Sequence, residues 1–208
     1  MEGIYRFQRH IYDVTRRYYL LGRDELLDRL AVPIDGSVLE IGCGTGRNLM
    51  GVARRYPTAR IYGLDISEEM LKSATNSLER SGNRSRTVLA CADATTFQAE
   101  KCFGQSKFDR MFFSYTLSMI PDWQLALERA LDCLGANGAL HIVDFGQSAK
   151  LPKFFRSTLF AWLKLFHVHP RQDLVAKLKA IAAAKGLSLT FESRFRDYAW
   201  LMVLRRVA

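Results

Sequence analysis

A glycine-rich turn follows a strongly apolar run early in the chain, in the segment VLEIGCGTGRN at residues 38–48. The apolar residues before the first glycine predict a buried strand, and the residues after the last glycine predict a helix. Glycine has no Cβ, so it can adopt positive φ and lets a ligand approach the backbone N–H groups closely. The segment therefore predicts a strand, a loop and a helix that together hold a cofactor.

The spacing of the glycines separates this loop from dinucleotide-binding loops. Those loops typically read Gly-x-Gly-x-x-Gly, whereas the glycines here are Gly42, Gly44 and Gly46. An acid, Glu40, also lies two residues before the first glycine. We interpret the loop as a site for S-adenosylmethionine, a cofactor that has no pyrophosphate.

Two further acids lie at the ends of strand-like runs. Asp65 follows the apolar residues 61–64, and an acid at this place can accept hydrogen bonds from two ribose hydroxyls. Asp93 ends the run 88–92, where it could meet the adenine amino group. The alternative for each acid is a turn or helix cap. We expect three strand ends to direct polar groups into one crevice.

These motifs resemble those of the class I S-adenosylmethionine-dependent methyltransferases, with VLEIGCGTGRN, GLDIS (63–67) and CADAT (91–95) matching successive cofactor motifs. The resemblance covers residues 35–145. It implies S-adenosylmethionine as cofactor, S-adenosylhomocysteine as product and no metal. The cofactor-binding residues that it implies are Glu40, Gly42, Cys43, Gly44, Gly46, Asn48, Asp65, Ile66, Met70, Asp93, Ala94 and Ser114.

Within that superfamily the chain looks most like the diacylglyceryl-homoserine N-methyltransferases of betaine-lipid synthesis. The similar segments are YRFQRHIYDVTRRYYLLGRD (5–24), SYTLSMIPDW (114–123), LHIVDFG (140–146) and DYAWLMVLRR (197–206). This resemblance implies a lipid or other small-molecule amine as the acceptor. Two alternatives stay open: an N- or O-methyltransferase of a soluble metabolite, and a cofactor-binding protein without catalysis.

The alternation of apolar runs with helical stretches predicts an α/β fold with a parallel sheet and helices on both faces. The resemblance makes it a Rossmann-like, seven-stranded, mostly parallel sheet with an antiparallel last strand. The expected strands are 37–41, 60–64, 87–92, 108–113, 140–145, 187–195 and 198–204. The expected helices are 4–31 with a break near Gly22, 47–56, one that Ser67 caps, 123–134 and 172–185.

With 208 residues and 49% hydrophobic content, the chain suits one methyltransferase domain. We divide it into a helical cap (1–31), a cofactor-binding core (37–146), a basic aromatic insertion (147–169) and a C-terminal helix and hairpin (170–208). An apolar leader and a membrane-length apolar stretch are both missing from the sequence, which predicts a cytoplasmic protein, possibly peripheral on the inner membrane face. The four cysteines lack zinc-site spacing. The sequence does not indicate the oligomeric state.

The net charge of +9 is concentrated in the last third of the chain. Residues 145–208 carry 12 basic and 3 acidic side chains, whereas residues 31–144 carry 12 and 13. The excess predicts attraction to an anionic membrane surface or to nucleic acid, unless it is merely a solvated basic face. Residues 114–120 lack the Asn/Asp-Pro-Pro-Tyr/Phe motif of methyltransferases that act on base amines, which argues against nucleic acid.

Methyl transfer from a sulfonium is an in-line displacement, so positioning and water exclusion can supply most of the catalysis. We place Tyr115 nearest the reactive methyl and expect Asp144 to attract the substrate ammonium. Tyr5, Tyr12 and Tyr19 repeat every seven residues and would share one helical face. They either line the acceptor pocket, with Tyr19 nearest the chemistry, or pack in the core. The candidate proton acceptors are His10, also at the acceptor site, and His141.

Residues 151–168 combine aromatic and basic side chains. Phe155, Leu159, Trp162 and Phe166 fall on one helical face, with Lys153, Arg156 and Lys164 nearby. This composition is typical of an element that lies on a lipid surface. The alternative is a buried lid helix that contacts the sheet.

Overall fold

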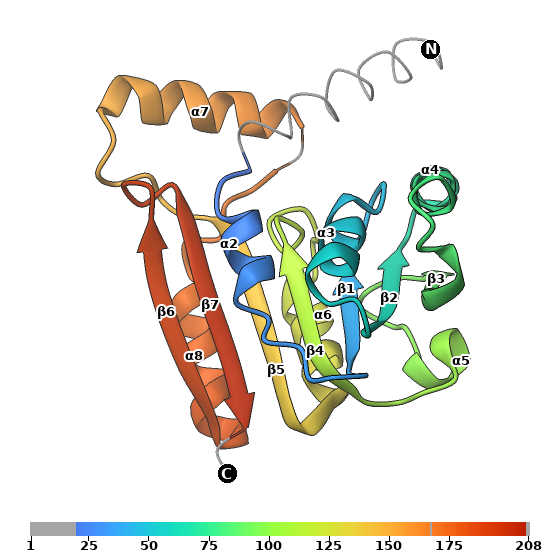
Figure 1. Ribbon diagram of the computed structural model, residues 1–208. Coiled ribbons are helices and arrows are strands. Elements are labelled where there is room, and N and C mark those ends of the chain that lie inside the picture. The colour runs from blue at the N-terminus through green and yellow to red at the C-terminus, as the bar shows by residue number, and fades with distance from the viewer. Residues whose placement is uncertain (1–19, 167, 207–208) are drawn as a thin grey trace.

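The computed structural model describes residues 20–166 and 168–206. The described strands are β1 (Ser37–Ile41), β2 (Arg60–Asp65), β3 (Thr87–Cys91), β4 (Phe108–Ser114), β5 (Leu134–Phe145), β6 (Leu187–Arg194) and β7 (Ala199–Arg206). The described helices are α2 (Arg23–Asp28), α3 (Arg47–Arg55), α4 (Glu68–Arg80), α5 (Ala99–Phe103), α6 (Trp123–Asp132), α7 (Lys153–Leu165) and α8 (Leu174–Lys185), with a 3-10 turn η1 (Arg84–Arg86). Figure 1 shows their arrangement.

The strands form a seven-stranded sheet in the order β3-β2-β1-β4-β5-β7-β6. β1 to β5 pair in parallel, and β7 is antiparallel to both of its neighbours, β5 and β6. This confirms the predicted Rossmann-like architecture. The chain leaves β1 toward β2 on one side and reaches β4 on the other, so the strand order reverses at β1. A crevice forms at such a switch point, beyond the carboxyl ends of the strands.

Helices cover both faces of the sheet, which explains why most side chains of its central strands are apolar and buried. All five residues of β1 are buried. Side chains from α5, α6 and α8 pack on one face, and side chains from α2, α3 and α4 pack on the other (Figure 1). The two layers hold the carboxyl ends of the strands in fixed register.

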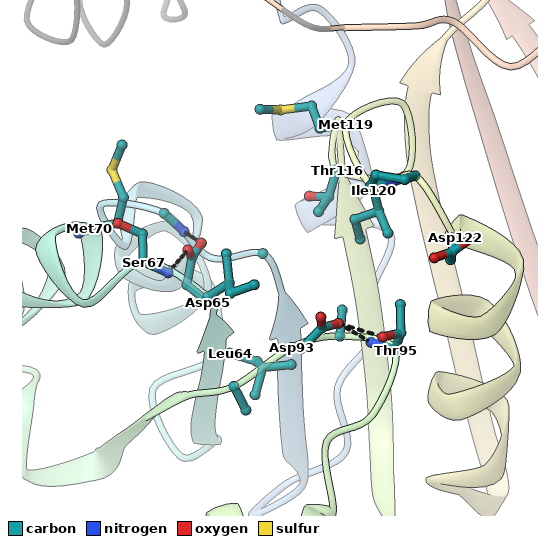
Figure 2. A pocket seen from close by; sticks show the side chains of 16 residues that line it. Leu64, Asp65, Ser67, Met70, Asp93, Thr95, Thr116, Met119, Ile120 and Asp122 are labelled. Carbon is teal, nitrogen blue, oxygen red and sulfur yellow. Dashed lines mark hydrogen bonds between the residues drawn. The ribbon is translucent and has the colours of Figure 1, made fainter. Parts of the chain in front are cut away.

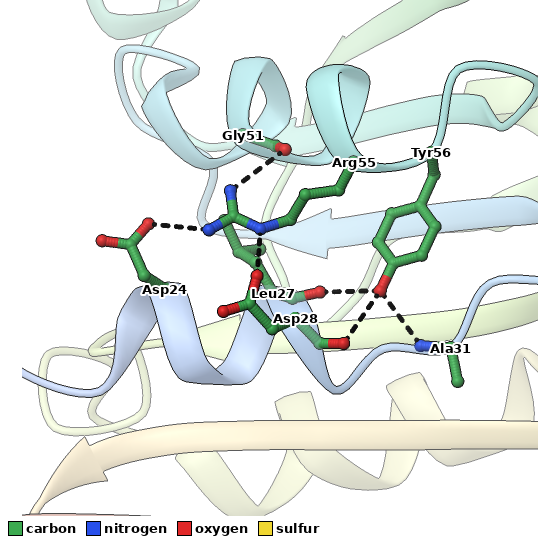
Figure 3. A network of polar contacts seen from close by, with 7 residues as sticks. All are labelled: Asp24, Leu27, Asp28, Ala31, Gly51, Arg55 and Tyr56. Atoms are coloured by element: carbon green, nitrogen blue, oxygen red, sulfur yellow. Dashed lines mark hydrogen bonds and ion pairs between the residues drawn. The ribbon is translucent and has the colours of Figure 1, made fainter.

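Polar contacts fasten α2 to α3 (Figure 3). The Arg55 guanidinium of α3 pairs with the carboxylates of Asp24 and Asp28 on α2. The Tyr56 hydroxyl lies 2.9 Å from the Leu27 carbonyl oxygen, to which it donates. These contacts fix the segment that enters the sheet from the N-terminal side.

Most element boundaries agree with the sequence prediction, and the exceptions have local causes. β5 begins at Leu134, six residues earlier than expected, because Leu134 pairs with Phe108 across an irregular register. Gly186 caps α8 with φ of 62°, a conformation that favours glycine. The predicted hairpin is also confirmed, and its turn places residues 195–197 at positive φ. Within the described ranges, none of the helices is long and apolar enough to cross a bilayer.

The apolar stripe of α7 packs inward, which corrects the predicted orientation of that helix. Leu163 is buried, and Leu159, Trp162 and Phe166 pack against the core cluster on the α2 and α3 face. Three of the four apolar residues of the predicted interfacial face therefore pack against the core, whereas the fourth, Phe155, is 49% exposed. On α7, the large apolar side chains left most exposed are Phe154, 83% exposed, and Leu165, 76% exposed.

Candidate active site

The glycine loop turns sharply away from β1. The N–H groups of Gly42 and Cys43 both donate to the Leu64 carbonyl oxygen, over 2.7 and 2.9 Å, which ties the loop to the end of β2. Gly42, Gly44 and Gly46 all have positive φ, which favours glycine. A Cβ on Gly42 would lie 2.3 Å from Thr116 Cγ2, whereas a Cβ on Gly44 would meet nothing within 4 Å. Gly44 therefore leaves open the space that a ligand needs.

Asp65 holds the loop from the neighbouring strand. Its Oδ2 accepts a 2.7 Å hydrogen bond from the Gly44 N–H, and its Oδ1 accepts one of 2.9 Å from the Ser67 N–H. Ser67 in turn caps α4, accepting from the Met70 N–H. One carboxylate thus joins the glycine loop to the start of α4.

A cavity of about 480 Å³ opens beside these groups. Figure 2 shows Asp65 and Met70 on one side of it, with Thr116, Met119 and Ile120 across from them. Of the predicted cofactor residues, it is lined by Gly42, Gly44, Asp65, Ile66, Met70, Asp93 and Ala94. Asp93 accepts from the N–H and hydroxyl of Thr95, and these bonds lower the pKa of its carboxyl.

A smaller cavity of about 60 Å³ adjoins the first, because Gly42 and Gly44 line both. Of the predicted cofactor residues, it adds Glu40, Cys43, Asn48 and Ser114. The Glu40 side chain is buried, and its Oε1 accepts a 2.7 Å hydrogen bond from Asn48 Nδ2. Burial, together with Glu40 and Asp65, raises the pKa of the Cys43 thiol, so this sulfur is a neutral wall group.

Gly46 is the one predicted cofactor residue that lines neither cavity. It precedes α3, and a Cβ there would lie 3.0 Å from the Ala74 Cβ. Its lack of a side chain therefore serves close packing between α3 and α4.

The loop after β4 closes the far side of the cavity, and sequence reasoning did not assign it to the cofactor. Thr116, Met119, Ile120, Pro121 and Asp122 all line the cavity. The positions of these residues depend on tertiary contacts. Within the stretch 114–123, the sequence had assigned site roles only to Ser114 and Tyr115.

Two elements remote in sequence hold this loop. On one side, the Asp144 carboxylate of β5 accepts from the Ser118 N–H at 3.1 Å. On the other, the His169 N–H donates to the Ser118 carbonyl oxygen at 2.9 Å, and Arg171 donates to the carbonyl oxygens of Ile120 and Leu117 at 2.6 and 3.3 Å. The segment that follows α7 is thereby bonded to the wall of the cavity.

Asp144 itself lies outside both cavities. It is fully buried, and its second oxygen accepts from the Phe145 N–H at 2.8 Å. Burial raises the pKa of Asp144 to about 6, although the bonds from Phe145 and Ser118 oppose the rise. This placement indicates that Asp144 positions the loop. It does not favour the predicted contact of Asp144 with a substrate ammonium.

Tyr115 also lines neither cavity. Its hydroxyl donates to the Leu21 carbonyl oxygen at 2.5 Å, and its ring packs edge-on against Phe145 with centroids 4.5 Å apart. The residue has φ of 58°, a costly conformation for a residue that carries a Cβ. This turn carries the chain from β4 to Thr116. A place for Tyr115 in the acceptor wall stays a prediction.

The remaining predicted residues separate into two groups. Tyr5, His10, Tyr12 and Tyr19 lie outside the described residues. His141 is described, but it lines a different groove, with Leu201 and Arg205. Burial and the charges of Arg205 and Arg110 lower the pKa of His141 to about 3, so its imidazole is neutral at pH 7.

The residues of the two cavities suit S-adenosylmethionine. The open space at Gly44 accommodates a ligand against the backbone, and the carboxylates of Asp65 and Asp93 can accept hydrogen bonds from ribose and adenine. Glu40 places a third carboxylate where a cationic amino group could pair with it. The described part of the chain contains no cluster of three or more His, Cys, Asp or Glu residues arranged to hold a metal ion.

Sequence relatives point to the same chemistry. Trans-aconitate 2-methyltransferase from Methylobacterium radiotolerans is 31% identical over 118 residues, which cover 57% of this chain and 41% of the relative. Malonyl-(acyl-carrier protein) O-methyltransferase 1 from Ilyobacter polytropus is 29% identical over 133 residues, or 62% of this chain and 47% of the relative. The chain thus spans less than half the length of each of these relatives.

The fold also matches solved structures. The plantazolicin methyltransferase BpumL, in complex with a triazolic desmethylPZN analog and SAH, superposes with a TM-score of 0.73 at 15% identity, covering 96% of this chain and 91% of that one. The family model described as a methyltransferase domain matches residues 35–186. Because that match includes the larger cavity and most of the sheet, the chain belongs to the methyltransferase-domain family and has the fold of the class I S-adenosylmethionine-dependent methyltransferases.

Proposed function

We propose that this protein transfers methyl groups from S-adenosylmethionine to an amine. The observation that carries the proposal is the cavity at the switch point of the sheet, where the open Gly44 backbone lies beside Asp65 and Asp93. Family membership supports the same reaction class.

Each polar residue of the cavities would have a defined task. Asp65 would accept hydrogen bonds from the ribose hydroxyls, Asp93 would meet the adenine, and Glu40 would balance the charge of the methionyl ammonium. When bound, S-adenosylmethionine supplies an electrophilic methyl group on a sulfonium sulfur. Met119 and Ile120 would exclude water from the far wall, which strengthens the electrostatic contacts inside.

A dedicated base is not required for this acceptor class. An α-amine has a pKa of about 8, so a neutral nucleophilic fraction exists at pH 7. Catalysis then depends on holding the amine in line with the methyl group. Aromatic faces at the acceptor site, the role predicted for Tyr5, Tyr12 and Tyr19, would tolerate the ammonium charge that develops with successive methylations.

For the acceptor, we propose the headgroup amine of diacylglyceryl-homoserine, methylated to the trimethylated betaine lipid. The resemblance of residues 5–24, 114–123, 140–146 and 197–206 to that family supports this choice. So does the basic composition of residues 145–208, which suits a protein that works at the surface of an anionic membrane.

A second candidate is methylation of a small soluble acid. It is supported by the relative named for trans-aconitate, which is 31% identical over 118 residues. In that case α7 would serve as a lid and the basic charge would attract the acid itself.

A single assay distinguishes these candidates. Purified protein is incubated with S-adenosylmethionine and either diacylglyceryl-homoserine in mixed micelles or trans-aconitate and related acids, and S-adenosylhomocysteine and product masses are measured. The proposal predicts that the lipid headgroup gains up to three methyl groups and that Asp65→Ala lowers the rate. Methylation of the acids alone would favour the second candidate. Cofactor binding by calorimetry without turnover of any acceptor would indicate a non-catalytic protein.

A further inference from the structure

We propose that the outer face of α7, formed by Lys153, Phe154, Lys164 and Leu165, docks the protein on an anionic lipid surface. The inference rests on the proposed function, because it names the surface from which the acceptor would be taken.

The outer face exposes two large apolar side chains at opposite ends of the helix. Phe154 is 83% exposed and Leu165 is 76% exposed. The opposite face of α7 packs against the core through Leu163, Leu159 and Trp162. Burying aromatic and aliphatic groups at the headgroup boundary is what drives interfacial helices onto a bilayer.

The charged side chains of the sequence segment that contains α7 are all basic. From Phe145 to Gln172 the sequence has five lysines and arginines and no acid. Lys153 and Lys164 are exposed, and within residues 20–166 and 168–206 neither forms an ion pair with an acidic side chain. Arg156 instead lies over the Phe160 ring at 5.5 Å. A cationic rim around exposed apolar side chains complements an anionic lipid surface and would repel another basic protein face.

The position of α7 relates this surface to the cavity. Figure 1 shows α7 above β6 and β7, at the same end of the molecule to which β2 and β4 point and at which the cavity opens. A protein resting on α7 would therefore turn its catalytic end toward the headgroups. The helix would lie in the interface and would not span the bilayer.

The test is co-sedimentation with vesicles of phosphatidylglycerol and phosphatidylcholine, compared with vesicles of phosphatidylcholine alone. We expect wild type to pellet with the anionic vesicles. Lys153→Glu with Lys164→Glu should weaken this binding at least tenfold, because each lysine near an anionic surface contributes about fivefold. Phe154→Ser with Leu165→Ser should weaken binding as well, and this loss should persist in high salt.

Two matched controls keep the charge and the apolar changes separate from general effects. Lys177→Glu with Lys179→Glu makes the same charge change on α8, which packs on a face of the sheet, and Ile34→Ser removes an exposed apolar group that precedes β1. Both should bind vesicles as wild type does. Equal binding by the α7 variants and the controls would overturn the proposal, as would equal binding to neutral vesicles.

Two further measurements assign a failure to its cause. If sedimentation velocity shows that wild type self-associates and that Phe154→Ser with Leu165→Ser abolishes this, the face binds a second copy and the lipid proposal is overturned. Turnover of a water-soluble homoserine headgroup analogue reports on the proposed function alone. If wild type binds anionic vesicles but does not methylate this analogue, the proposed homoserine acceptor is rejected and the docking surface stays supported.

Discussion

Asp65 provides the sharpest test of the proposed cofactor site, because one carboxylate would serve both the ligand and the loop. Asp65→Ala would remove the charged acceptor proposed for two ribose hydroxyls, and hydrogen bonds to charged groups contribute about 1.5 to 3 kcal/mol. Water can replace part of the lost hydrogen bonding. We therefore expect the free energy of cofactor binding to weaken by about 1 to 3 kcal/mol, which lowers cofactor affinity about 5-fold to 150-fold.

The same substitution leaves the Gly44 and Ser67 N–H groups without their acceptor, at distances of 2.7 and 2.9 Å in the wild type. Each intramolecular bond contributes about 1 kcal/mol. For a chain of this size, that loss lowers the melting temperature by about 4 to 8 °C. The fold should survive, because both N–H groups are close enough to the cavity for water to reach them.

Calorimetric titration with S-adenosylhomocysteine measures the affinity without turnover, and thermal unfolding measures the stability. Asp109→Ala is the matched control, since Asp109 accepts from the N–H and hydroxyl of Ser37, both at 2.8 Å, at the other end of β1. It should lower the melting temperature and leave affinity unchanged. If folded Asp65→Ala binds as tightly as wild type, Asp65 is not a cofactor ligand and the motif assignment fails.

Substitutions in the glycine loop, at Asp144 and at Arg171 test three other parts of the structure. Gly44→Ala should keep the fold, at a cost of about 1 kcal/mol for its positive φ, and lower cofactor affinity in titrations, whereas Gly42→Ala should lower the melting temperature more because its Cβ meets Thr116. Burial raises the pKa of Asp144 from 3.8 to about 6, so the stability due to its protonation is complete below pH 3.8 and is lost as the pH rises through 6. A shift of one pKa unit corresponds to about 1.4 kcal/mol, so the free energy of unfolding of Asp144→Asn should rise by about 3 kcal/mol relative to that of wild type between pH 3.8 and 7. Urea unfolding at each pH measures this difference, and a difference that does not change with pH would contradict the prediction. Arg171→Ala should raise KM for the cofactor, and Arg171→Lys should raise it less. If both variants have the same KM as each other, Arg171 is not a positioning residue.

The cofactor half of the site was predictable because its signals are local. Gly42 and Gly44 must adopt positive φ within one turn, and Asp65 follows directly from its own strand. Such constraints act over a few residues and therefore leave a readable pattern. The mostly parallel sheet followed from the alternation of strands and helices, and its antiparallel last strand from the family resemblance.

The opposite wall was not predictable, because its residues meet the cofactor cavity only after the sheet has formed. Met119 and Ile120 are ordinary apolar residues in sequence, and their place depends on bonds from Asp144 and Arg171. The periodicity of α7 likewise identified which side chains share a face, but periodicity alone does not say which face meets the body. The structure shows that Leu159, Trp162 and Phe166 pack against the core and that Phe154, outside that stripe, is exposed.

The bonds from His169 and Arg171 to the loop at Ser118 and Ile120 have a consequence for how the two ends of the reaction communicate. Few residues separate Leu165, the last of α7, from Arg171, so a displacement of the helix has little chain in which to dissipate before it reaches the cavity wall. Where a lipid surface and the cofactor favour the same arrangement of this loop, thermodynamic linkage makes their effects reciprocal. Membranes would then tighten cofactor binding by the same factor by which the cofactor retains the protein on the membrane, and the supply of methyl donor would set the protein's partition between membrane and solution.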